Sequence, residues 1–274
     1  MDESDSWAYR RWGSMGVIRT DSWLLDDFDN AIKICEKLQP YFKGKTAKQI
    51  YNQLLNFGMY QPSRSSKDFL HKMNEQKVWD QVERLFSKYK VKWSGPDIPV
   101  FLFPLAQSRS LFIRTDRKKG GVSFPDKMFL FLSSHEDAKE IEALFVHEYH
   151  HVCRLCKMNK KMGDYTLLDS LVIEGLAEYA VLKHCGAEYL ADWCRMYSEK
   201  EITYFWSKFL KKHLDFKKNE RVHDELLFGG GRVPKLLGYA VGYNIIDKYY
   251  KNHNYSTKLS FEIPAAKFVE DQNS

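Results

Sequence analysis

The chain has 274 residues, of which 44% are hydrophobic, 28% charged and 15% aromatic. The hydrophobic and charged shares are close to ordinary globular usage and the aromatic share is high, which excludes extensive disorder. The length suffices for one large domain or for a catalytic unit with a smaller appendage. The net charge is +6, but lysine and arginine are interspersed with acids in most segments, so we expect no nucleic-acid partner.

The sequence gives no sign of a membrane or an oxidising compartment. No apolar run approaches the roughly 20 residues of a membrane span, and the N-terminus lacks the apolar core of a signal peptide. Five cysteines form an odd, sparse set, which does not indicate a disulfide framework. We therefore expect a cytoplasmic protein with reduced thiols and no membrane partner. Residues 1–14 precede a second methionine, Met15, and are expected to be a disordered leader or tag-like segment.

Hydrophobic periodicity predicts helices in the first third of the chain, followed by short strands. The predicted helices cover residues 23–38, 46–56 and 67–88, and the β-prone runs cover residues 98–103, 110–113 and 128–132. Helices return after the strands, over residues 137–157, 166–184, 187–213 and 234–251. Asp164 or Thr166 can cap the second of these helices, and Pro234 suits the first turn of the last one. The predicted fold class is α+β, predominantly helical with a small β-sheet before residue 137.

An HExxH motif, His147-Glu-Tyr-His-His151, lies in the helix predicted over residues 137–157. Residues four apart share one helix face, so the imidazoles of His147 and His151 can bind one metal ion. Glu148 projects about 100° around the helix from His147 and can reach a water at that ion, where it would act as general base. The pentapeptide also arises by chance, so the prediction depends on a third ligand.

The next predicted helix, over residues 166–184, is apolar almost all round yet carries Glu174 and Glu178. Two carboxylates four apart repel each other, and burying either one without a partner costs several kcal/mol. Because a divalent cation resolves this conflict, we predict Glu174 as the third ligand, with zinc's fourth position open for water. Glu178 and Asp169 are expected to hold imidazole N–H groups, and Gly175 to let the two helices approach closely. The alternative is that both glutamates face solvent.

The motif residues resemble a known family. His147–His151, followed by Ile173–Glu178 and later by Gly238–Tyr243, resemble the YjaZ-like predicted Zn-dependent proteases, and the similarity runs from about Met15 to Tyr250. The Glu-Gly-Leu-Ala element is also similar to the third-ligand segment of gluzincin aminopeptidases. The resemblance implies a zincin-like fold that binds Zn²⁺ through the two histidines and Glu174, with Glu148 as base, and it implies no particular substrate. The interval between His151 and Glu174 is 22 residues, which is longer than the corresponding interval in better-known gluzincins. Glu178 therefore stays an alternative to Glu174 as the third ligand.

A zinc hydrolase usually adds a hydrogen-bond donor that stabilises the oxyanion of the transition state. Tyr239 and Tyr243 lie four apart, and each directly follows a glycine that permits close approach to a neighbour or ligand. Gluzincins that the chain resembles use a tyrosine downstream of the ligand glutamate, so we favour Tyr239, followed by Tyr243, His223 and Arg232. The alternative is that both tyrosines belong to the aromatic core.

Two further features have weaker interpretations. His150 follows the motif glutamate by two residues and points away from the ligand pair, so we expect it to support the ligands from outside or to pack in the core. Residues 120–125 or 128–132 could form an exposed edge strand that pairs with an extended peptide, although a buried sheet is the simpler expectation for each run.

Taken together, these features predict a zinc-dependent hydrolase that cleaves amide bonds in a peptide or protein substrate. Two alternatives stay open: a catalytically silent or regulatory zincin-fold protein that binds a partner, and an amidohydrolase or esterase that acts on a non-peptide. We expect a helical N-terminal part over residues 15–90 and a zincin-like catalytic part over residues 91–274, either separate or joined in one compact domain.

Overall fold

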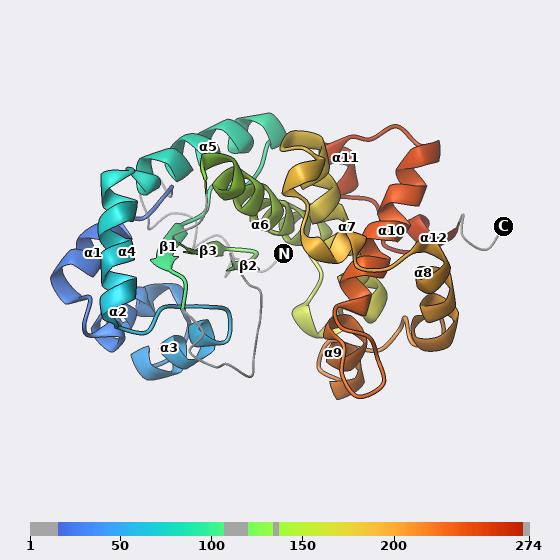
Figure 1. Cartoon of the computed structure of the whole chain (residues 1–274), viewed down its shortest axis with the longest axis horizontal. Coiled ribbons are helices and arrows are strands. Elements are labelled where there is room, and N and C mark those ends of the chain that lie inside the picture. Colours follow the sequence, from blue (N-terminus) through green and yellow to red (C-terminus); the bar gives the residue numbers. More distant parts are fainter. Residues whose placement is uncertain (1–15, 107–119, 134–136, 271–274) are drawn as a thin grey trace, which may run out of the picture. The chain divides into compact units, whose positions relative to one another are not determined.

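The computed structural model describes residues 16–106, 120–133 and 137–270 (Figure 1). The fold is α+β and mostly helical with a small three-stranded sheet, so the predicted fold class is confirmed at this level. The chain divides into two compact units, Met1–Phe145 and Val146–Ser274, and the division falls inside one long helix. The domain limits expected from the sequence, 15–90 and 91–274, stay a prediction, and the expected leader over residues 1–14 lies outside the described residues.

Within the described residues, the first unit contains five α-helices, one 3₁₀ turn, the sheet and the beginning of the HExxH helix. Its elements are α1 (Thr20–Asp27), α2 (Ala31–Leu38), η1 (Gln39–Tyr41), α3 (Ala47–Leu55), α4 (Arg64–Glu75), α5 (Val78–Trp93), β1 (Val100–Pro104), β2 (Gly120–Phe124), β3 (Lys127–Leu132) and the start of α6 (Ala138–Met158). The helix predicted over 23–38 is two helices, because the Asn30 side chain caps a new start at α2. The stretch predicted as one helix over 67–88 also forms two helices, α4 and α5. They are separate because Lys77 has a φ of 52°, which a right-handed α-helix cannot contain.

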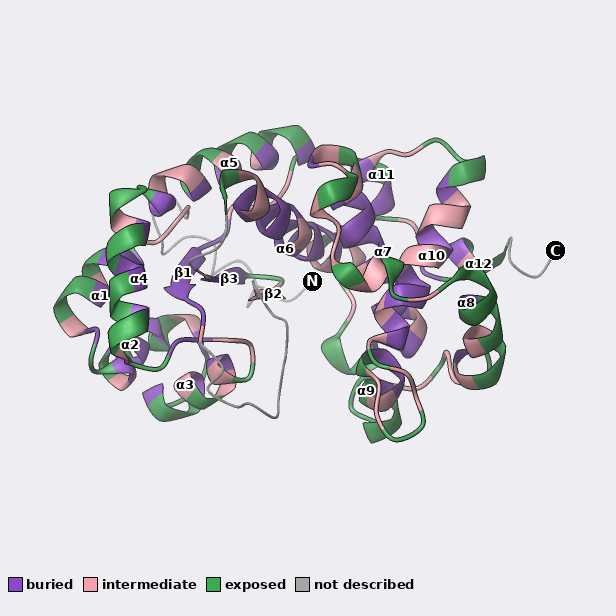
Figure 2. Cartoon of the chain, viewed as in Figure 1, coloured by how far each residue is buried: buried purple, intermediate pink, exposed green. Residues whose placement is uncertain are grey.

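The sheet has the strand order β1-β3-β2. β1 runs parallel to β3 with Val100 opposite Met128, and β2 runs antiparallel to β3 with Gly120 opposite Phe131. β1 and β3 are buried along their whole length, as Figure 2 shows, and the rings of Phe101 and Phe129 stack at 4.7 Å. The suggestion that residues 128–132 form an edge strand is therefore wrong, because β3 is the central strand and both its sides are already paired. The run predicted at 110–113 lies outside the described residues.

Glu142 anchors the first part of α6 to α5 within the first unit. Its carboxylate accepts hydrogen bonds from Lys88 Nζ at 2.7 Å, Tyr89 Oη at 2.8 Å and Lys139 Nζ at 2.7 Å. Burial raises the pKa of Glu142, but the hydrogen bonds from Lys139, Lys88 and Tyr89 outweigh it and bring the pKa down to about 2. The ionised carboxylate is thus the form that the fold stabilises.

Replacement of Glu142 by glutamine should lower the free energy of unfolding by about 1–2 kcal/mol at pH 6. Because the folded-state pKa is depressed below the ordinary value of 4.5, the contribution of the carboxylate is present above pH 4.5 and is lost as the pH falls towards 2. Urea titrations of both proteins at pH 6 and at pH 3 measure this. The difference between wild type and Glu142→Gln should shrink at pH 3, and a difference that stays constant would contradict the ionic origin of the effect.

The second unit is built almost entirely from helices. Its elements are the rest of α6, η2 (Met162–Asp164), α7 (Leu167–His184), the 3₁₀ turns η3 (Ala187–Tyr189) and η4 (Asp192–Arg195), α8 (Glu199–Phe205), the π-helical turn η5 (Trp206–Leu210), α9 (Arg221–Phe228), α10 (Leu237–Asn252), α11 (Thr257–Ser260) and α12 (Lys267–Glu270). The helices predicted over 137–157 and 166–184 agree with α6 and α7.

The prediction of one helix over 187–213 is wrong. Gly186 has a φ of +116°, which ends the preceding helix, and Leu190 and Ala191 are extended, so only short turns form before Ser198 caps α8. The last long helix begins three residues after Pro234, because Leu236 takes a left-handed φ of 53°. α9 lies in a stretch for which the sequence analysis predicted no helix.

α7 and α10 pack against each other more closely than side chains would normally allow (Figure 1). A Cβ atom at Gly175 would lie 2.2 Å from the carbonyl oxygen of Gly242, and one at Gly242 would lie 2.1 Å from that of Leu171. Gly175 therefore serves the contact of α7 with α10, and the expectation that it lets α7 approach the HExxH helix is wrong. This contact fixes the helix that carries both glutamates.

Candidate metal centre

Local sequence fixes where α7 begins, and hence where its glutamates lie. The Thr166 hydroxyl accepts a hydrogen bond from the Asp169 N–H, and the Asp169 carboxylate accepts one from the Thr166 N–H, which forms a capping box. The same carboxylate binds Lys160 Nζ. The expectation that Asp169 holds an imidazole N–H is wrong, because His147 Nδ1 pairs with Glu178 and His151 Nδ1 has no hydrogen-bond partner among the described residues. Of the two caps that the sequence allowed, Asp164 and Thr166, the helix uses Thr166.

Three ligand atoms converge where α6 faces α7. His147 Nε2 lies 3.0 Å from His151 Nε2, and Glu174 Oε2 lies 3.4 Å from the first and 3.5 Å from the second. In a tetrahedral site with zinc–ligand bonds of 2.0–2.1 Å, neighbouring ligand atoms are about 3.3 Å apart. The three side chains thus fit one zinc ion and leave a fourth position for water or substrate. Within the described residues they also form the cluster best placed to hold a metal.

The electrostatics of the cluster favour a cation. Burial lowers the pKa of His147, but hydrogen bonds to Glu174 and Glu178 and the charges of both carboxylates raise it to about 10. Burial raises the pKa of Glu174, and the charge of His151 and hydrogen bonds from both histidines bring it well below its ordinary range. A divalent cation held by the imidazoles and the Glu174 carboxylate would compensate the negative charge that is buried here.

The two glutamates have different positions. Glu174 lies beside both Nε2 atoms, whereas Glu178, only 3% exposed, lies behind His147, with Oε2 at 2.8 Å from His147 Nδ1. This arrangement makes Glu174 the nearer choice for the ligand and Glu178 the group that would fix the imidazole's orientation. His151 Nδ1 is buried and has no hydrogen-bond partner among the described residues.

Glu148, the expected general base, directly follows His147 on α6. Its side chain is buried, at 6% exposure. Charged side chains are seldom fully buried unless they are paired with another group. Its position within the HExxH helix turn agrees with the role that the motif predicts.

The predicted oxyanion donors have different surroundings. The Tyr239 ring lies between Trp193 at 5.3 Å and Phe228 at 5.7 Å, and the Tyr243 ring contacts Trp193 at 6.5 Å. Burial raises the pKa of Tyr243, with smaller contributions from Cys194, Asp247 and Glu178. Both tyrosines thus belong to an aromatic cluster at the edge of the core, and their role as donors stays a prediction.

The other two candidate donors, His223 and Arg232, differ strongly in burial. His223 is fully buried on α9, where Nε2 lies 2.9 Å from Ser170 Oγ and Nδ1 lies 2.9 Å from Asp224 Oδ1. Ser170 precedes Glu174 by one helical turn, so it projects from the same face of α7 as the ligand. Arg232 is exposed in the loop before α10. The spacing of Ser170 from Glu174 is a sequence signal that could have drawn attention to Ser170.

His150 faces away from the ligand pair, as its position on the helix predicts. Its Nε2 lies 3.3 Å from Ser260 Oγ, its ring contacts Phe261, and burial lowers its pKa well below the ordinary value. The side chain packs α11 onto α6, so of the two roles expected for it the packing role agrees with these contacts.

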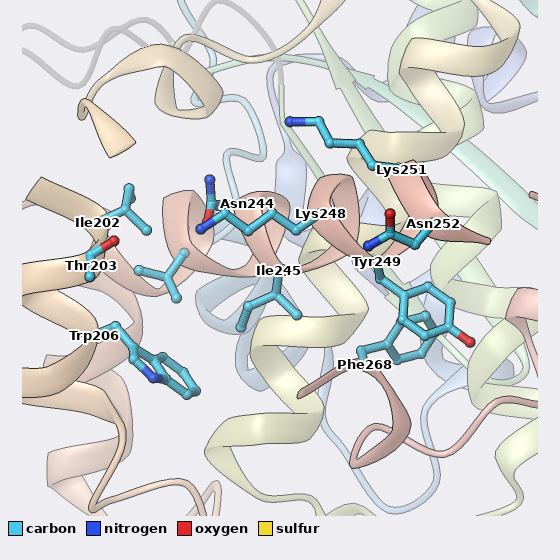
Figure 3. A pocket seen from close by; sticks show the side chains of 11 residues that line it. Ile202, Thr203, Trp206, Asn244, Ile245, Lys248, Tyr249, Lys251, Asn252 and Phe268 are labelled. Carbon is cyan, nitrogen blue, oxygen red and sulfur yellow. The ribbon is translucent and has the colours of Figure 1, made fainter. Parts of the chain in front are cut away.

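A surface cavity of about 400 Å³ lies elsewhere in the second unit, between α8, α10 and α12. Figure 3 shows its apolar side, formed by Ile202, Trp206, Ile245 and Phe268, and the lysines along its rim. None of its lining residues belongs to the metal cluster. The candidate site is therefore defined by its side-chain chemistry and not by this cavity.

Comparison with known proteins agrees with this geometry. Residues 78–270 match the family described as Predicted Zn-dependent protease (DUF2268). The chain belongs to this family. It is 38% identical over 265 residues to "Uncharacterized protein YjaZ" of Bacillus subtilis (strain 168), covering 93% of this chain and 99% of that protein. It is 27% identical over 139 residues to "Uncharacterized protein YjfC" of the same organism, covering 47% of this chain and 46% of that protein. No solved structure matches the chain significantly.

The family match covers all the residues of the metal cluster. The family's description names a metal and a reaction class and gives no substrate. Among the described helices, none combines the length and the apolar character needed to cross a membrane.

Proposed function

We propose that the chain is a zinc-dependent peptidase with a zincin-like, gluzincin-type site. The observation that carries this proposal is the convergence of His147 Nε2, His151 Nε2 and Glu174 Oε2 within 3.5 Å of one another, with Glu148 buried on the same helix turn. Three protein ligands and one open position are the arrangement of catalytic zinc sites, whereas structural sites use four protein ligands. The family's description supports the metal and the reaction class.

When bound, zinc would supply a Lewis acid that polarises the substrate carbonyl and makes a water molecule more acidic. Glu148 would accept the proton of the attacking water and then donate it to the leaving amine. Glu178 would keep His147 in the tautomer that offers Nε2 to the metal, because its carboxylate accepts the proton on Nδ1. Tyr239, Tyr243 and His223 are the proposed donors to the oxyanion.

Metal removal tests the proposal directly. Purified protein should contain about one zinc per chain by elemental analysis. A peptide library incubated with the protein should be cleaved, and a chelator should lower the rate at least about 100-fold, with recovery on addition of zinc. Zinc should also raise the melting temperature of chelator-treated protein, because a ligand of the folded state alone stabilises it by about 4 kcal/mol at a thousand times its Kd.

The results also distinguish the alternatives. Zinc without cleavage of any peptide, but with hydrolysis of simple esters or amides, would favour a non-peptide hydrolase. Zinc without any hydrolysis would favour a regulatory protein of this fold that binds a partner. A protein that neither contains nor binds zinc would contradict the proposed site as a whole.

A further inference from the structure

The carboxylate of Glu178 makes two hydrogen bonds, one with each oxygen. Oε2 lies 2.8 Å from His147 Nδ1, and Oε1 accepts a hydrogen bond from the peptide N–H of Ala191 at 2.5 Å. His151 Nδ1 has no comparable partner among the described residues. Of the two ligand imidazoles, His147 is thus the one whose orientation a carboxylate controls, and that carboxylate is itself held by a main-chain donor.

Ala191 lies in a short structured segment, Gly186–Ser198, between α7 and α8. The segment turns at η3 and η4, and the guanidinium of Arg195 donates a hydrogen bond to the carbonyl oxygen of Ala187. The Trp193 ring rests on Tyr239 of α10 at 5.3 Å. Burial, and next the charge of Glu178, raise the pKa of the Cys194 thiol, which agrees with a position beside that carboxylate.

We propose that this segment is part of the metal centre: the peptide N–H of Ala191 positions Glu178, and through Glu178 it positions His147 for the metal. The inference rests on the metal site of the proposed function and goes beyond the ligands. A buried carboxylate that loses one of its two donors keeps an unsatisfied oxygen and gains freedom to rotate. The imidazole it holds would then bind metal less well, since groups behind the ligands typically contribute 10–100-fold to affinity.

The segment around Ala191 and zinc binding must influence each other, because linkage between two sites is reciprocal. Zinc bound at His147 Nε2 would fix the orientation of the imidazole ring with Nδ1 facing Glu178, and it would thereby hold Glu178 and the Ala191 N–H in place. Zinc should therefore order the segment, and the segment should raise the affinity for zinc. Trp193 extends this effect to the aromatic cluster on α10, since its ring contacts both Tyr239 and Tyr243.

Ala191→Pro removes the donor without straining the backbone, and because the ring carbon Cδ replaces the amide hydrogen, the Glu178 oxygen must also move away. Ala191 has φ −61° and ψ 144°, which proline adopts without strain, and Leu190 has φ −61° and ψ 141°, which suits the residue before a proline. The matched control is Ala191→Ser, which keeps the N–H. Zinc Kd, measured by competition with a chromogenic chelator, should rise about 10–100-fold in Ala191→Pro and stay within about 3-fold of wild type in Ala191→Ser.

Hydrogen exchange of the wild-type protein and of Ala191→Pro supplies a second test. Zinc should slow amide exchange across residues 187–198, and this protection should be absent from Ala191→Pro. Equal zinc affinities in Ala191→Pro and wild type, or a segment whose exchange zinc leaves unchanged, would overturn the inference while the metal site stands. A wild-type protein that binds no zinc would instead overturn the metal site, and the inference with it.

Discussion

Replacing Glu148 by glutamine should reduce kcat for peptide hydrolysis by about 100- to 10,000-fold while zinc stays bound. The substitution removes the group that accepts a proton from water, and general acid–base catalysis contributes about 10²–10⁴-fold. None of the three ligand atoms belongs to Glu148, so the metal content should stay near one per chain. Glutamine has nearly the same shape, so the packing of this buried position should be kept.

The matched control is Glu140→Gln, two turns earlier on the same helix, where the side chain is half-buried and outside the cluster. It should leave kcat and zinc content unchanged. Steady-state kinetics and elemental analysis of the three proteins decide the outcome. If Glu148→Gln keeps wild-type activity, the proposed chemistry is wrong, and a biological function that survives the substitution would favour the regulatory alternative.

The sequence predicted the helices of the metal centre because their signals are local. The HExxH spacing, the Thr166 cap and two acids on an apolar helix depend only on neighbours within a few turns. These signals were enough to select His147, His151 and Glu174, which the structure brings together. The prediction of one helix over residues 187–213 was wrong, since Gly186 has a positive φ and the residues after it form only short turns before α8.

The errors at the site have one physical cause, which is that tertiary partners are not encoded by spacing. Asp169 could reach an imidazole or its own helix start, and it takes the helix start. Gly175 could face either of two helices, and it faces α10. The donor that holds Glu178 is a main-chain N–H, which every residue except proline carries, so no sequence pattern could have indicated Ala191.

Replacing Gly242 by alanine should lower the free energy of unfolding by about 3 kcal/mol, at the upper end of what overpacking usually costs. A Cβ at this position would lie 2.1 Å from the Leu171 carbonyl oxygen and 2.9 Å from its carbonyl carbon. Both are main-chain atoms of α7, so no rotamer change can relieve the clash and the two helices must separate. α7 carries Glu174 and Glu178. The separation of α7 from α10 should therefore shift these glutamates and weaken zinc binding.

Gly163→Ala is the control for this prediction, because a Cβ there meets nothing within 4 Å and should change stability by less than about 0.5 kcal/mol. Urea denaturation of both variants and of wild type gives the comparison, and chelator competition gives the zinc Kd. A Gly242→Ala protein as stable as wild type would contradict the close contact of α7 with α10. A destabilised variant with unchanged zinc affinity would show instead that α10 supports the fold without positioning α7. The geometry of the metal centre would then depend on α6, α7 and the segment around Ala191.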